Sequence, residues 1–201
     1  MNPRMWRRMN RAINHFFLLA GMSIFLFACS HYSPKPHGYP RVQYPEKNYE
    51  VFDSNCAYTF QIPVYAEMRL DEDDNSEPCW YNLEFPDFDG TLHLSYKQFK
   101  TKDQLYKLGE DAYKLAMKHA VKAEEISETE QNDTASGNTV MIYELEGKTA
   151  TPYNFYITDN KRHFIRGAFY FNNYTNGDSI APVFDFIKQD IERLIYTTRW
   201  K

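Results

Sequence analysis

The chain has 201 residues, of which 43% are hydrophobic and 17% aromatic, with 23 basic and 27 acidic side chains. The hydrophobic share is too high for a disordered chain, and the length predicts one globular domain. A general nucleic-acid binder is excluded, because that function needs a clustered excess of positive charge.

Residues 1–28 have the pattern of an export signal. Four arginines and no acidic residue fall in this segment, and an apolar run covers residues 16–28. As a helix the run would span about 20 Å, which is short for a membrane span. A basic start, a short apolar stretch and small residues near its end are typical of a signal peptide. Without this segment, 19 basic residues face 27 acidic ones, a formal charge of −8.

The end of the apolar run resembles the lipobox of bacterial lipoproteins. Leu26 and Ala28 stand at the expected places before Cys29, which would become the diacylated N-terminus, whereas Phe27 is larger than usual. The alternative is a short N-terminal membrane anchor with Cys29 there by coincidence. Two acyl chains would hold the protein firmly at a membrane. Ser30 and the lack of a following acidic run resemble the sorting signal for the periplasmic face of the outer membrane.

The two remaining cysteines, Cys56 and Cys79, form an even pair in a compartment that permits disulfides. A bridge between them would close a loop of about 24 residues and stabilise the fold by about 3 kcal/mol in the chain-entropy model. The alternatives are two separately buried thiols or half of a metal site. No CxxC or HxxxH spacing accompanies the pair, so we expect neither a metal nor a cofactor.

Residues 29–48 combine the lipid anchor with a proline-rich tether, and residues 49–201 form the globular domain. In a polyproline conformation, at about 3.1 Å per residue, the tether would reach roughly 45 Å from the membrane. Its tyrosines are unusual for a simple spacer, so part of it would lie along the domain or a partner. Because Tyr39, Arg41 and Tyr44 cannot be sheet residues, we identify them as the candidate partner-binding set.

The domain is predicted to contain seven strands and two helices. Short apolar stretches separated by turns predict strands over residues 57–62, 65–70, 80–85, 91–96, 140–145, 153–157 and 163–171. In the ranges 80–85 and 91–96, apolar and polar residues alternate, as in half-buried antiparallel strands. Between the second and third of these, Asp71, Asp73 and Asn75 match an EF-hand loop. Ser76 replaces the glycine of that loop and Asn82 its bidentate Glu, which favours a solvated acidic loop.

Apolar residues at steps of three and four predict an amphipathic helix over residues 102–123, with one face made of Leu105, Leu108, Ala112, Leu115 and His119. A second amphipathic helix begins near Ser179, takes Pro182 in its first turn and ends the chain. The predicted fold class is α+β, a single antiparallel sheet of about six or seven strands. Its apolar face would be covered by both helices.

The sequence shows no pattern typical of an enzyme. It contains no GxSxG, no HExxH and no glycine-rich phosphate loop. The domain's three histidines, His93, His119 and His163, are widely spaced. We therefore predict no catalytic residues. The alternative is a periplasmic ligand-binding or cell-wall-hydrolysing module with His93 or His163 in a cleft at the sheet edge.

Several segments together resemble one family, the gliding-motility lipoprotein GldD of the Bacteroidetes. They are residues 34–41, 44–45, 55–60, 79–86, 94–97, 158–159, 162–172, 178–182 and 200–201. The resemblance implies a non-enzymatic envelope lipoprotein needed for surface gliding and for the linked type IX secretion machinery. Its partners would be other envelope proteins of that apparatus, and Cys29 would be the lipid site.

The same resemblance implies a glycan site. Bacteria of this group O-glycosylate exported proteins at sites that resemble Asp-Ser/Thr-apolar, and Thr134 follows Asp133 in a polar turn. Ser179 also fits the pattern, but its hydroxyl is needed as a helix cap. Thr134 is therefore the predicted glycosylation site.

Overall fold

The computed structural model describes residues 43–118, 123–147, 149–172 and 177–201. All of them belong to a compact unit that runs from Gly38 to Lys201. The predicted signal peptide and the residues Cys29, Tyr39 and Arg41 lie outside the described part of the chain.

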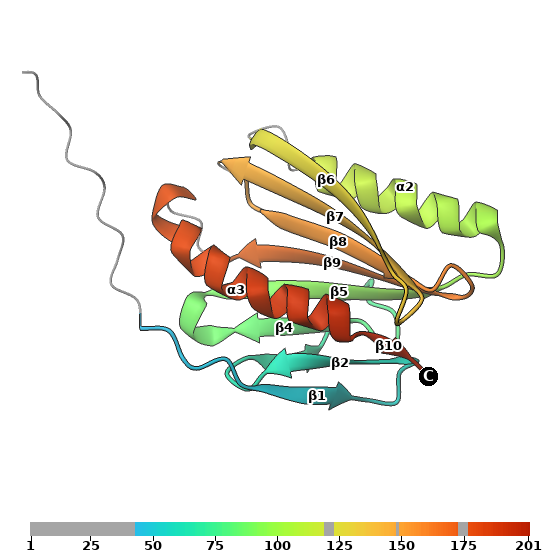
Figure 1. The fold of residues 1–201 in the computed structure, drawn as a ribbon, viewed down its shortest axis with the longest axis horizontal. Helices are drawn as coiled ribbons and strands as arrows, with labels where there is room; N and C mark the ends of the chain where they lie inside the picture. Colours follow the sequence, from blue (N-terminus) through green and yellow to red (C-terminus); the bar gives the residue numbers. More distant parts are fainter. Residues whose placement is uncertain (1–42, 119–122, 148, 173–176) are drawn as a thin grey trace, which may run out of the picture. The chain divides into compact units, whose positions relative to one another are not determined.

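A seven-stranded antiparallel sheet forms the centre of this unit (Figure 1). Its strand order is β3-β4-β5-β9-β8-β7-β6. The strands are β3 (Glu67–Leu70), β4 (Tyr81–Phe85), β5 (Gly90–Gln98), β6 (Ala123–Asp133), β7 (Asn138–Gly147), β8 (Tyr153–Thr158) and β9 (His163–Phe171). The predicted antiparallel α+β fold is confirmed.

A second, three-stranded sheet was not predicted. It pairs β1 (Tyr49–Asp53), β2 (Tyr58–Pro63) and β10 (Arg199–Trp200) in the order β1-β2-β10. The strand predicted over residues 57–62 therefore belongs to this sheet and not to the large one. Tyr58, Phe60 and Ile62 of β2 are buried and alternate with half-buried residues, so one face of the small sheet contributes to the core.

Helices α2 (Lys102–Lys118) and α3 (Gly177–Thr197) cover opposite faces of the large sheet, which corrects the expectation that both predicted helices cover one face. The reason is the composition of β8, in which neighbouring residues are almost all buried. Tyr153, Phe155 and Ile157 pack in the core on the α3 side, whereas Tyr156 packs against the α2 cluster. A strand that is apolar on both sides needs a cover on each.

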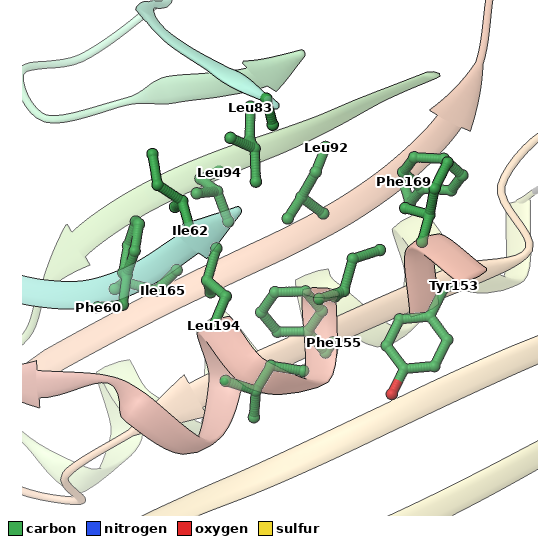
Figure 2. Close-up of a cluster of buried hydrophobic side chains, with 14 of the residues drawn as sticks. Phe60, Ile62, Leu83, Leu92, Leu94, Tyr153, Phe155, Ile165, Phe169 and Leu194 are labelled. Carbon is green, nitrogen blue, oxygen red and sulfur yellow. The ribbon is translucent and has the colours of Figure 1, made fainter. Parts of the chain in front are cut away.

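The main core lies between the large sheet, helix α3 and strand β2. Figure 2 shows Leu194 of α3 together with Phe60 and Ile62 of β2 and with side chains of the large sheet, among them Leu94 and Phe155. A smaller cluster lies under α2, where Leu105, Leu108 and Ala112 pack near Phe164. Leu115, predicted on the same face of α2, is exposed, and Ala116 is buried in its place. The step of four residues from Ala112 keeps that side chain on the buried side of the helix.

The disulfide between Cys56 and Cys79 is present, with the two Cα atoms 5.8 Å apart. Cys56 precedes β2 and Cys79 precedes β4, so the bridge links the small sheet to the large one.

Removing this bridge should lower the free energy of unfolding by about 3 kcal/mol, because the unfolded chain regains the entropy of an open loop. Urea denaturation of the double variant Cys56→Ser/Cys79→Ser, compared with the oxidised wild type, measures the loss. Reductant should shift the wild-type transition and leave that of the double variant in place. Equal midpoints for the oxidised wild type and the variant would contradict the prediction.

Candidate functional site

The last residues of the predicted tether, 43–48, lie against the domain at helix α3. The ring of Tyr44 packs 4.6 Å from that of Phe186 and 6.2 Å from that of Phe88, measured between centroids. Tyr65 joins them, 5.8 Å from Phe186 and 6.2 Å from Phe88. We call these four residues the junction cluster. Aromatic rings at such separations attract each other beyond the area they bury, so the cluster fastens the end of the tether to the domain.

Asp190 of α3 lies beside this cluster and is completely buried. Its Oδ1 accepts a hydrogen bond from the Tyr49 hydroxyl at 2.9 Å, and its Oδ2 accepts one from the Tyr65 hydroxyl at 2.5 Å. The ammonium of Lys47 lies 2.7 Å from Oδ2 and also donates to the main-chain oxygen of Phe186 at 2.6 Å. A buried carboxylate needs compensation of this kind to remain charged.

The sequence of α3 explains why Asp190 faces the tether. Ile187, Ile191 and Leu194 are fully buried, so the side of the helix that carries them faces the main core. Phe186 lies four residues before Asp190, so both side chains are on one side of the helix, one turn apart. The Lys47 ammonium sits over the Phe186 ring, 3.4 Å from its centroid. Lys47 thereby contacts both residues and holds the incoming chain along α3.

Burial and the carboxylate together keep the surrounding phenols protonated. Burial, followed by the hydrogen bond to Asp190, raises the pKa of Tyr49 to about 12. The pKa of Tyr65 is raised for the same two reasons. Burial lowers the pKa of Lys47, while the bond to Asp190 acts in the opposite direction. At neutral pH both phenols therefore remain hydrogen-bond donors to Asp190.

Stability should fall as the pH rises from about 10 to about 12. An unfolded tyrosine titrates near pH 10, whereas Tyr49 in the folded protein titrates at about 12. Over this range the unfolded state releases a proton that the folded state keeps, so alkali favours unfolding. Urea denaturation at a series of pH values measures the slope. The slope should be shallower in Tyr49→Phe/Tyr65→Phe, and identical slopes would contradict this assignment.

Of the predicted partner-binding residues, only Tyr44 falls in the described ranges. Its ring packs on Phe88 and Phe186, yet 41% of the residue remains exposed. The sequence analysis missed Lys47, Tyr65 and Asp190. A signal for Asp190 was available, because an acidic residue next to the apolar stripe of a helix is unusual and calls for a partner. The sequence offers no comparable signal for Lys47.

The histidines expected in the alternative hypothesis are not brought together. His93 on β5 projects from the face opposite to the buried Leu92 and Leu94, and its Nδ1 lies 2.8 Å from Oδ1 of Asn82. His163 on β9 projects from the other face, where its Nδ1 lies 2.7 Å from the Tyr96 hydroxyl and its ring stacks on Trp200. Burial lowers the pKa of both rings. The third histidine, His119, lies outside the described residues.

Two further features of the described ranges bear on the predicted sites. No three His, Cys, Asp or Glu side chains gather there in a way that would hold a metal ion. Thr134 is exposed in the turn between β6 and β7, where the main-chain N–H of Gly137 donates to the oxygen of Asp133 at 2.8 Å. The exposed position is compatible with a glycan, and glycosylation at Thr134 remains a prediction.

Comparison with known proteins gives a family and a structural likeness. Residues 29–200 match the family model described as gliding motility lipoprotein GldD. No curated protein matches the chain. The solution structure of cyanobacterial PsbP (CyanoP) from Synechocystis sp. PCC 6803 is 9% identical, with a TM-score of 0.48 over 81% of this chain and 98% of that one. Within the ranges that the structure describes, none of the helices has the length and apolar character needed to cross a bilayer.

Proposed function

The chain belongs to the family of the gliding motility lipoprotein GldD, and we propose that it is a structural and assembly component of the gliding apparatus and of the linked type IX secretion machinery. It acts by holding envelope proteins in place rather than by converting a substrate. Diacylated Cys29 fixes it to the envelope, facing the periplasm at the outer membrane.

The observation that carries this proposal is the firm joint between tether and domain. A simple spacer would leave the domain free to rotate about its anchor. Here Tyr44 packs on Phe186, and Lys47 forms an ion pair with the buried Asp190. The described end of the tether is therefore fastened to helix α3, which packs in the main core. Such a joint suits a component that must keep a fixed place between neighbours.

The partner surface includes Tyr39 and Arg41, which precede the joint in the sequence, and Tyr44, which is part of it. Tyr44 packs on Phe186 while 41% of the residue remains exposed. A rigid aromatic side chain contributes contact area at a small entropic cost. A partner that binds here contacts the tether and the domain together. The partners are other envelope proteins of the gliding and secretion apparatus.

The proposal is tested by crosslinking in intact cells and purifying the lipoprotein with its neighbours. The triple variant Tyr39→Ala/Arg41→Ala/Tyr44→Ala should lose co-purified envelope proteins while remaining folded and acylated. Tyr196→Ala is the matched control, because Tyr196 is 44% exposed and Tyr44 41%, and Tyr196 lies in the C-terminal part of α3. Undiminished co-purification and normal gliding in the triple variant would overturn the proposed surface.

A further inference from the structure

A cleft of about 800 Å³ lies between helix α2 and the large sheet, away from the junction cluster. Its volume is within the about 300–1,000 Å³ that is typical of small-ligand sites. The residues that line it come from α2 and from β6, β7 and β8, with Asn160 from the turn after β8. Neither His93 nor His163 is among them, so this is not the histidine cleft of the alternative hypothesis.

Four tyrosines give the cleft its aromatic character. Tyr106 and Tyr113 come from α2, Tyr143 from β7 and Tyr156 from β8. Tyr113 meets Tyr143 edge to face, with ring centroids 5.8 Å apart. Tyr106 is 68% exposed and Tyr113 is 43% exposed, so both offer ring surface to a ligand. Rings of this kind bind flat ligands with apolar faces and polar edges.

Polar groups of both kinds accompany the rings. Lys102 and Lys114 balance Glu110 and Glu130, so the lining has no formal net charge. Glu110 accepts a hydrogen bond from the Tyr106 hydroxyl at 3.1 Å and lies 3.6 Å from the Lys114 ammonium. Donors and acceptors are thus interleaved with ring faces. A strongly charged ligand would find no excess of the opposite charge here.

Gly109 keeps the α2 wall of the cleft open. A Cβ built on Gly109 would lie 3.8 Å from the Tyr156 hydroxyl, an ordinary contact. A longer side chain would extend from this point into the space over Tyr156. Glycine destabilises a helix interior by about 1 kcal/mol relative to alanine. At position 109 its missing side chain leaves the cleft open on the α2 side.

We propose that this cleft binds a neutral oligosaccharide. A sugar ring has an apolar face that stacks on tyrosine and a rim of hydroxyls that pairs with carboxylate, amide and ammonium groups. The charge-balanced lining fits an uncharged ligand better than a polyanion or a basic peptide. This binding activity is independent of the partner surface at Tyr39, Arg41 and Tyr44.

Saturation-transfer NMR on the full acylated chain tests the proposal, with maltohexaose, cellohexaose and chitohexaose as probes. At least one of these should bind, and Tyr113→Ala should weaken its binding about tenfold, as expected for loss of one stacking ring. Tyr196→Ala, which removes a tyrosine of nearly the same exposure from α3, should bind like the wild type. Gly109→Leu should block binding by filling the cleft, and leucine favours the helix more than glycine does.

Absence of binding by all three hexasaccharides would overturn the proposal. Binding that survives both Tyr113→Ala and Gly109→Leu would overturn it too, because the sugar would then sit elsewhere. Binding of an unrelated basic peptide in the cleft, in place of sugar, would also contradict it. None of these results changes the co-purification expected of the Tyr39, Arg41 and Tyr44 variants, so the two proposals fail separately.

Discussion

Replacing Asp190 with alanine should lower the free energy of unfolding by about 4 kcal/mol, as expected when one partner of a buried ion pair is removed. The Lys47 ammonium would be left without its counter-charge, and the hydroxyls of Tyr49 and Tyr65 would lose their acceptor. Hydrogen bonds to a charged group contribute about 1.5–3 kcal/mol each, and the three donors, which are only partly buried, regain part of this from water. Urea denaturation of the purified domain measures the loss.

A charge-balanced variant separates this effect from general damage to α3. In Asp190→Asn, Lys47 still lacks its counter-charge, whereas Asp190→Asn/Lys47→Met removes both charges together. The double variant should be more stable than Asp190→Asn alone, because replacing a whole buried ion pair costs little. A double variant less stable than the single one would contradict the role assigned to Lys47. Limited proteolysis near residue 43 should be faster in Asp190→Asn.

Replacing Phe155 with alanine should also cost about 4 kcal/mol, the usual price of a large cavity in a well-packed core. Phe155 is 1% exposed and packs in the main core with α3 and β2. Its ring lies directly over Gly167 of the neighbouring strand β9, and a Cβ at Gly167 would come within 2.2 Å of it. The ring therefore occupies the space that a side chain at position 167 would need.

This close packing predicts that the stability effects of substitutions at Phe155 and Gly167 are not additive. Gly167→Ala alone should destabilise the fold by about 3 kcal/mol through overpacking. In Phe155→Ala/Gly167→Ala the new methyl group enters the vacated space, so the combined loss should fall short of the sum by at least about 1 kcal/mol. Gly109→Ala is the control, because its Cβ meets only an ordinary contact. Additive losses would show that the ring and the glycine are not coupled.

Strands rich in apolar residues could be predicted from the sequence, whereas a mainly polar strand could not. The predicted ranges 91–96 and 163–171 lie within β5 and β9, where one face carries large apolar side chains. Strand β6 was missed because almost all of its residues are exposed and its sequence is mainly polar and acidic. It lies at the sheet edge and pairs with β7 only. An edge strand buries little surface, so it leaves little hydrophobic pattern.

The sheet face that each helix covers could not be predicted from the sequence of the helix alone. The apolar side of α2 could be predicted as far as Ala112, but not the sheet face on which it packs. That choice follows from β8, whose two faces are both apolar. The small sheet likewise depends on pairing between segments that are far apart in the sequence. Its strand β10, at the C-terminus, pairs with β2 near the start of the domain.

The candidate site was predictable in part. Tyr44 was identified because an aromatic residue among prolines has no place in a sheet, and the structure puts it on Phe186. Its partners could not be foreseen, because Lys47 and Asp190 come together only when the C-terminal helix packs beside the start of the domain. The Cys56–Cys79 bridge was predictable from cysteine arithmetic alone.

The central claim is that this lipoprotein works as an anchored holder of neighbouring proteins. The most direct test is gliding in cells whose only copy is a soluble form, with Cys29→Ala behind a signal that releases the chain into the periplasm. The account predicts that this form folds, keeps its disulfide and fails to restore gliding, whereas the acylated form restores it. Full gliding with the freely diffusing form would contradict the account and point to an activity that needs no attachment.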